Sequence, residues 1–145
     1  MARVWALTPQ QSIEAECARR GRGAVVAGCM AILDGGNFDD ALVLALGGPA
    51  AEQVLDGREG GRDGYWPRVW AARGLLYAWS DDAAPAVIAA LADDSWRVRE
   101  MAARVVARHQ VGDALSAVAA LRDDPVQRVR AAAERAVRSL TAVGA

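Results

Sequence analysis

The chain has 145 residues with a formal net charge of −1, and 53% of them are apolar, which is enough to bury the core of one domain. This charge balance gives no general electrostatic reason for the chain to bind nucleic acid or an anionic membrane. All 17 basic residues are arginine, and 11 of them lie in residues 65–145, beside 9 acidic residues. We therefore expect a single domain, residues 1–145, with its arginines concentrated in the second half.

The N-terminal residues MARVWALTPQQ lack the charged and then apolar pattern of a secretion signal. The longest apolar run, residues 24–33, is too short to cross a bilayer. We predict a cytoplasmic protein with no membrane contact, in which Cys17 and Cys29 stay reduced. Two cysteines and one histidine at these spacings do not supply the ligands of a metal site, and we expect no cofactor.

The first 64 residues predict four helices joined by turns that contain glycine. Thr8 is a typical N-cap, and Pro9 suits the first helical position. Three further short helices are predicted, each ending at glycine, over residues 22–36, 38–48 and 49–57. Residues 57–64 form a glycine-rich loop without the Gly-Lys-Ser/Thr of a phosphate-binding loop. We interpret residues 1–64 as degenerate repeats that cap a repeat array.

Residues 65–141 repeat with a period of 31 residues. The matching positions are Arg68, Arg99 and Arg130; Arg73, Arg104 and Arg135; Asp82 and Asp113; Val87 and Val118; and Asp93 and Asp124. Independent matches at one offset seldom arise by chance, so the pattern indicates internal structural repeats.

Each repeat predicts a pair of helices. Asp82 and Asp113 are candidate N-caps of the first helix in two successive pairs, and Pro85 suits the first turn after Asp82. The second helix of one pair begins near Ser95, and Pro125 suits the first turn of the corresponding helix in the next pair. Paired aspartates lie in the turn between the two helices. Their negative charges, near the N-terminus of the following helix, interact favourably with its macrodipole.

The segments DDSWRVREMAARVVA and DDPVQRVRAAAERAV resemble the Asp-x-x-x-Val-Arg-x-x-Ala-Ala core of HEAT repeats and of short HEAT-like repeats, the kind also found in phycobilin lyase subunits. The resemblance covers residues 65–141. It implies an all-α fold, an α-solenoid of antiparallel HEAT-like helix pairs with roughly eight to nine helices and a degenerate N-terminal cap. It further implies that Asp93, Asp124, Arg99 and Arg130 link neighbouring repeats, with Arg68 a weaker member of this set.

One line of side chains follows the second helix of each repeat. At 100° per residue, Arg104 and Arg108 each fall within about 20° of Arg97, at the edge of the apolar face. We define the Arg/aromatic ridge as these three residues and their equivalents in the other repeats, with Trp96 as a stacking residue at its start: Trp66, Arg73, Tyr77, Trp96, Arg97, Arg104, Arg108, Arg128 and Arg135. Glu100 can pair with Arg104 at i+4.

The resemblance places the Arg/aromatic ridge on the concave face of the solenoid. Trp, Tyr and Arg dominate the binding hot spots of protein interfaces, so the ridge is a candidate partner surface. The alternative is a solvated edge, where long arginine stems cover alanine-rich helices.

The helix over residues 66–79 is apolar almost all round, which is typical of a helix buried on both sides. We expect the N-terminal helices to fold over it, with Trp70 in the core. The alternatives are that a partner or a second copy of the chain covers it.

No residue pattern indicates an enzyme. His109 lies on an apolar helix face near a helix end, the serines have no obvious base, and the paired acids occur at turns where capping explains them. We predict a non-catalytic protein-interaction scaffold whose partner protein has an acidic patch. The alternatives are a nucleic-acid-binding module, an accessory subunit of a lyase-type enzyme, which the repeat resemblance alone implies, and self-association as a homodimer.

Overall fold

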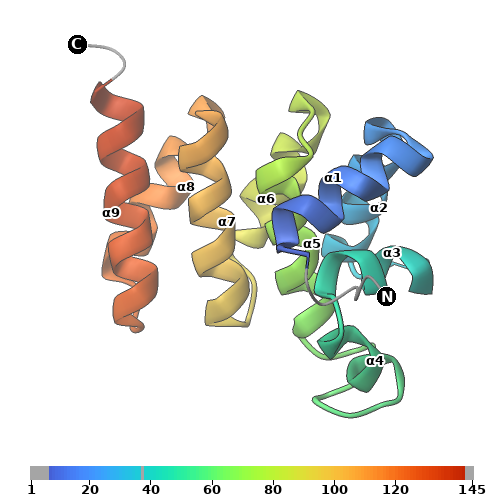
Figure 1. Cartoon of the computed structure of the whole chain (residues 1–145). Helices are drawn as coiled ribbons and strands as arrows, with labels where there is room; N and C mark the ends of the chain where they lie inside the picture. The colour runs from blue at the N-terminus through green and yellow to red at the C-terminus, as the bar shows by residue number, and fades with distance from the viewer. Residues whose placement is uncertain (1–6, 37, 143–145) are drawn as a thin grey trace. The chain divides into compact units, whose positions relative to one another are not determined.

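A computed structural model describes residues 7–36 and 38–142 of the chain. These residues form nine α-helices connected by turns and short 3-10 segments, and no strand occurs among them (Figure 1). The helices group into two compact units, Met1–Ser80 and Asp81–Ala145. The predicted all-α fold built from helix pairs is confirmed.

The first unit contains five helices. These are α1 (Pro9–Arg20), α2 (Arg22–Leu33), α3 (Asp40–Gly47), α4 (Ala50–Leu55) and α5 (Trp66–Tyr77). The predicted start of α1 is confirmed, because Thr8 accepts a hydrogen bond from the Gln11 N–H at 3.1 Å and its own N–H donates to the Gln11 side chain at 2.9 Å. Turns occupy residues 57–64 between α4 and α5, as the glycine-rich composition predicts.

Helix α5 is the centre of the first unit and packs against α1, α2 and α3. A close approach requires glycine at position 74, because a Cβ there would lie 2.7 Å from Leu46 Cδ2 and 3.0 Å from Cys29 Sγ. Trp70 is 5% exposed and Leu75 is fully buried. The prediction that the N-terminal helices cover the apolar helix is therefore confirmed, as is the core position of Trp70.

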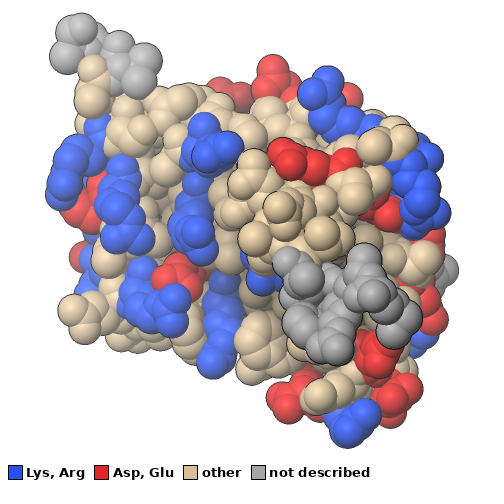
Figure 2. Space-filling view, viewed as in Figure 1, with Lys and Arg blue, Asp and Glu red and all other residues tan. Residues whose placement is uncertain are grey.

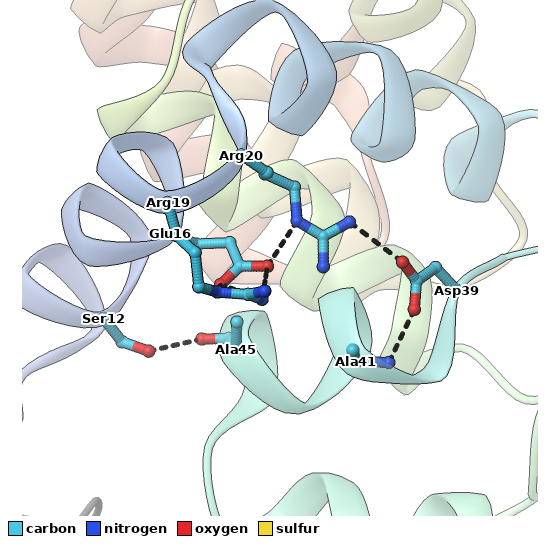
Figure 3. Close-up of polar contacts among 7 residues, drawn as sticks. All are labelled: Ser12, Glu16, Arg19, Arg20, Asp39, Ala41 and Ala45. Atoms are coloured by element: carbon cyan, nitrogen blue, oxygen red, sulfur yellow. Dashed lines mark hydrogen bonds and ion pairs between the residues drawn. The ribbon is translucent and has the colours of Figure 1, made fainter.

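A polar cluster ties α1 to α3 in the same unit (Figure 3). The buried carboxylate of Glu16 accepts hydrogen bonds from Arg19 and Arg20, and Arg20 also pairs with Asp39 at 2.9 Å. The hydroxyl of Ser12 donates to the Ala45 carbonyl at 2.7 Å. A buried carboxylate needs such partners, and this cluster was not predicted from the sequence.

The second unit consists of two helix pairs. The first pair is α6 (Ala84–Ala90) and α7 (Trp96–His109), and the second is α8 (Leu115–Ala120) and α9 (Gln127–Ala142). Within each pair the helices pack on one another, and α7 also packs along α9. Both long helices bury alanines and valines, among them Ala102, Val105, Val129, Ala132 and Ala136. Small side chains at these positions let the two long helices approach closely.

The predicted N-cap roles of Asp82 and Asp113 are wrong. Ala83 is the N-cap residue of α6 and Ala114 that of α8, and neither cap has a side-chain hydrogen bond. A 3-10 turn precedes each helix, Asp81–Ala83 in one pair and Gly112–Ala114 in the other. Each aspartate lies within the turn and too early to cap the helix.

Pro85 and Pro125 occupy different positions relative to the helices that follow them. Pro85 lies in the first turn of α6, as predicted. Pro125 instead precedes α9, which begins at Gln127, so the predicted position of Pro125 in the first turn is wrong. The start of α7 agrees with the prediction, with Ser95 as its N-cap residue.

Candidate functional site

Arg99 and Asp124 join the two helix pairs of the second unit. The guanidinium of Arg99 donates from Nε to Asp124 Oδ2 at 2.8 Å and from Nη2 to Oδ1 at 3.3 Å. Its Nη1 donates to the carbonyls of Asp93 and Asp94 at 2.8 and 3.1 Å. The side chains of Arg99 and Asp124 are only 15% and 4% exposed, so this bidentate pair is a buried structural link.

The same local geometry recurs one repeat later. Arg130 Nη1 donates to the Asp124 carbonyl at 2.8 Å, as Arg99 does to that of Asp93. The side chains of Asp93 and Asp124 accept the N–H groups two residues on, at Ser95 and Val126, both at 2.9 Å. The expected link between neighbouring repeats is confirmed for Arg99 and Asp124. Arg130 and the side chain of Asp93 contact the turn of their own repeat and order it.

Asp124 should make the stability of the second unit depend on pH. Burial raises the pKa of its carboxyl, but the hydrogen bonds from Arg99 and from the Val126 N–H outweigh burial, and the pKa stays below the ordinary value. A lowered folded pKa means that the stabilisation is present above the unfolded pKa of about 3.9 and is lost as the pH falls through the folded value. In urea titrations between about pH 5 and pH 2, Asp124→Asn should show a shallower loss of stability than the wild type. Asp123→Asn, at the exposed neighbour, should keep the wild-type slope, and equal slopes for all three proteins would contradict the assignment.

The Arg/aromatic ridge residues of the second unit lie on α7 and α9. Trp96, Arg97, Arg104 and Arg108 belong to α7, and Arg128 and Arg135 belong to α9. Figure 2 shows rows of basic side chains over the face that these two helices present in that view. The structure thus places these six residues on two helices that pack along each other.

A cluster around the Trp96 ring connects α7 to α9. The Cζ atoms of Arg97 and Arg128 lie 4.5 and 5.4 Å from the centroid of this ring, within the range of cation–π attraction. Arg128 Nε also donates to Glu100 Oε2 at 3.0 Å. The predicted pairing of Glu100 with Arg104 is wrong, because the carboxylate points to the neighbouring helix and holds Arg128 there.

Three arginines of the ridge are exposed and have no polar partner among the described residues. Within residues 7–36 and 38–142, Arg104, Arg108 and Arg135 form no hydrogen bond or ion pair with another residue. Unpaired guanidinium groups retain all five donors for an external anion. These three side chains are therefore the part of the ridge that is most available to a ligand.

Charge is segregated within the second unit. Residues 81–145 contain nine arginines and nine acidic residues, so the unit has no net charge. Helices α7 and α9 together contain eight of these arginines and only two of the acids, Glu100 and Glu134. The rest of the unit holds one arginine and seven acids, mostly at the turns. The two long helices are thus strongly cationic although the whole chain is not.

The other three ridge residues belong to α5 of the first unit. Trp66 is the first residue of α5 and stacks on Trp70 with ring centroids 5.9 Å apart. Arg73 Nη2 donates to the Leu46 carbonyl at 2.8 Å, and Tyr77, the last residue of α5, is partly exposed. Because these three residues and the other six lie in different units, the continuity of the ridge along the chain stays a prediction.

The groups that could support covalent or metal chemistry are poorly suited to it. Burial raises the pKa of the Cys29 thiol to about 12, with a smaller contribution from nearby Cys17, and burial also raises the pKa of Cys17. Thiols with raised pKa values are weak nucleophiles at neutral pH. Among the described residues, no group of three or more His, Cys, Asp or Glu side chains could hold a metal ion.

The ion pair of Glu100 with Arg128 was not predicted from the sequence, although the sequence contains a signal for it. Its equivalents one repeat away are Val69 and Ala131, so the acid breaks the 31-residue pattern. A polar residue that replaces an apolar one at a repeat position indicates a local contact. Here the contact is the ion pair with Arg128 across the two helices.

Comparison with known proteins identifies the repeats. A family model of HEAT repeats matches residues 63–138, which is more than half of the chain. No curated protein and no solved structure matches the chain. Of the helices formed by the described residues, none has the length and apolar character needed to span a membrane.

Proposed function

The chain belongs to the HEAT-repeat family, and we propose on this premise that it is a non-catalytic scaffold that binds a partner protein on α7 and α9. HEAT repeats commonly serve as protein-interaction scaffolds and are generally non-catalytic. The observation that supports this surface most strongly is that Arg104, Arg108 and Arg135 are exposed and unpaired within the described part of the chain.

The chemistry of the surface favours an acidic partner. Trp96 and Arg128 are held in place by contacts between α7 and α9, so little side-chain freedom is lost there on binding. Arginine forms bidentate hydrogen bonds with carboxylates, and two arginines of the same helices, Arg97 and Arg128, lie against the partly exposed indole of Trp96. We therefore propose a partner with an acidic patch. We also propose Trp66, Arg73 and Tyr77, on α5, as further partner-binding residues.

The spacing of the arginines indicates how acidic residues of the partner would be arranged. Arg97 and Arg104 are seven residues apart on one helix, which separates their Cα atoms by about 10 Å along the axis. Arg128 and Arg135 have the same spacing on α9. In a polyproline II segment, which has three residues per turn and rises about 3.1 Å per residue, side chains three residues apart lie on one face about 9 Å apart. A segment in this conformation with Glu at every third position would therefore meet successive arginines.

A peptide-binding experiment tests this proposal. We expect a fluorescein-labelled peptide with glutamate at every third position to bind the wild type in an anisotropy titration, and more weakly as salt increases. Joint replacement Arg104→Glu, Arg108→Glu and Arg135→Glu should weaken binding at least about tenfold, because attraction becomes repulsion. The matched control is Arg22→Glu, Arg58→Glu and Arg122→Glu, which makes the same charge change at exposed sites off the ridge. Equal affinity of both triple variants would contradict the proposal.

Nucleic-acid binding is the second candidate, and the cationic character of α7 and α9 favours it. A phosphate backbone would be bound with an affinity that falls steeply and linearly on a log–log plot against salt. Duplex and single-stranded DNA of equal charge to the peptide, titrated in the same way, separate the two candidates. DNA binding tighter than peptide binding at every salt concentration would replace the protein partner by a nucleic acid.

The proposed setting is the cytoplasm. Cys17 and Cys29 are both free thiols, and a reducing compartment keeps them so.

A homodimer is a further form of the protein-binding proposal, since the cationic helices of one copy could meet the acidic turns of another. Light scattering at low and high salt distinguishes self-association from binding to a different protein.

A further inference from the structure

A pocket of about 260 Å³ lies in the first unit between α4 and the start of α5. Its wall is largely apolar, and two indole rings form part of it. The residues that line it are Ala50, Gln53, Val54, Glu59, Trp66 and Trp70. The volume is just below the 300–1,000 Å³ typical of sites for drug-sized ligands, so the pocket fits a head group or a small ion.

The aromatic part of the pocket is rigidly held. Trp66 and Trp70 are stacked, with an angle of 23° between the ring planes. The Trp70 ring is fixed against Gly47, where an added Cβ would come within 2.6 Å of it. Tyr65 packs against Trp66 with ring centroids 5.2 Å apart. Two electron-rich rings in fixed positions attract a cation whose outer atoms are apolar.

The side chain of Glu59 lines the same pocket, and the backbone of this residue is strained. Glu59 has φ of 55°, a left-handed value that glycine adopts far more readily, and three glycines with positive φ surround it in the same loop, at positions 57, 60 and 61. Within the described part of the chain, the side chains of Glu59 and Gln53 form no hydrogen bond or ion pair. The loop therefore keeps an uncompensated negative charge at the pocket, at a position where glycine would relieve the strain.

We propose that this pocket binds a methylated ammonium group, with its methyl groups against Trp66 and Trp70 and its charge balanced by Glu59. A primary ammonium is less well suited, because it is strongly hydrated and the rest of this wall, apart from Gln53 and Glu59, is apolar. Methyl groups remove that need and spread the charge over an apolar surface. The pocket shares Trp66 with the α5 part of the Arg/aromatic ridge, and it does not involve the arginines of α7 and α9.

The test is a titration of the ¹⁵N-labelled full chain with choline, followed through the indole N–H signals in NMR spectra. The Trp66 and Trp70 signals should shift with saturation, while those of Trp79 and Trp96 should stay in place. Sodium chloride at equal ionic strength is the salt control. The neutral control is 3,3-dimethylbutan-1-ol, which has the shape of choline without its charge, and it should bind at least about tenfold more weakly.

Two variants of Glu59 distinguish a loss of binding caused by the missing charge from one caused by a folding defect. Glu59→Gln keeps the size of the side chain and should weaken choline binding at least about tenfold. Glu59→Gly should also lose binding but should raise the midpoint of urea unfolding, because glycine tolerates this φ. Loss of binding in a more stable protein cannot be a folding defect.

The proposal fails if the neutral alcohol binds as tightly as choline, if Glu59→Gln binds choline as the wild type does, or if neither Trp66 nor Trp70 responds. Two sources of the ligand are compared directly, namely free choline and a peptide with trimethyllysine. Binding of either one supports the site, and the tighter of the two identifies whether the head group comes from a small molecule or from a modified protein.

Discussion

Replacing Trp70 with alanine should lower the free energy of unfolding of the first unit by about 3–5 kcal/mol. The side chain is 5% exposed, stacks on Trp66 and contacts α3 at Gly47. Removing the indole loses its apolar burial and leaves a cavity between α3 and α5 that the surrounding backbone fills only partly. Urea unfolding followed by circular dichroism at 222 nm measures the change without relying on tryptophan fluorescence.

A double-mutant cycle tests whether the Trp70 ring fills this particular space. Gly47→Ala alone should be destabilising by about 1–3 kcal/mol, because the new Cβ would overlap the ring. In the Trp70→Ala background the same substitution should cost much less, since the space is then empty. Strictly additive effects of the two substitutions would show that they do not share this contact.

Replacing Arg99 with alanine should lower the stability of the second unit by about 3 kcal/mol. Among the described residues, the substitution leaves the Asp124 carboxylate, 4% exposed, with the Val126 N–H as its remaining hydrogen-bond donor. It also removes the donor to the carbonyls of Asp93 and Asp94 that orders the turn before α7. Urea unfolding measures the change in free energy.

Two further variants serve as controls for Arg99→Ala. Arg99→Lys keeps the charge but loses the bidentate geometry, and we expect an intermediate loss of stability. Arg104→Ala, at the exposed arginine five residues on, should change stability by less than about 0.5 kcal/mol. A similar loss for Arg99→Ala and Arg104→Ala would contradict the structural role of Arg99.

The repeat architecture was predictable because its signal is redundant. Matches at many positions agree on one period, so the register of α7 relative to α9 follows from the sequence alone. The roles of Arg99 and Asp124 followed from the same register, through the resemblance to HEAT repeats. The coverage of α5 by other helices was also predictable, since apolar residues on all sides leave no face for water.

The residues at which α6 and α8 begin were not predictable from capping preferences. Asp82 and Asp113 have the right residue type for an N-cap, but a 3-10 turn places both before the cap position. A capping preference of about 1 kcal/mol is easily overridden by the way the chain enters a packed pair. Helix boundaries therefore depended on tertiary packing.

Some features of the candidate sites were predictable from the sequence, and others were not. Helical periodicity predicted which arginines share a line on α7 and α9, because that depends only on 100° per residue. It did not predict that Glu100 pairs across the helices, or that Glu59 meets two indoles in one pocket. Both depend on where a loop or a neighbouring helix comes to lie, and a single sequence does not encode that in its local pattern.

In the proposed function, the arginines of α7 bind a partner protein. The most direct measurement is a paired capture from native lysate, read by quantitative mass spectrometry. The baits are the wild type, the joint variant Arg97→Glu, Arg104→Glu and Arg108→Glu, and the control variant Arg22→Glu, Arg58→Glu and Arg122→Glu. Each triple variant changes the net charge by −6, from −1 to −7, and circular dichroism verifies that each is folded. We predict a protein retained by the wild type and the control variant and lost from the α7 variant, whereas equal retention on all three baits would contradict the proposed function of this surface.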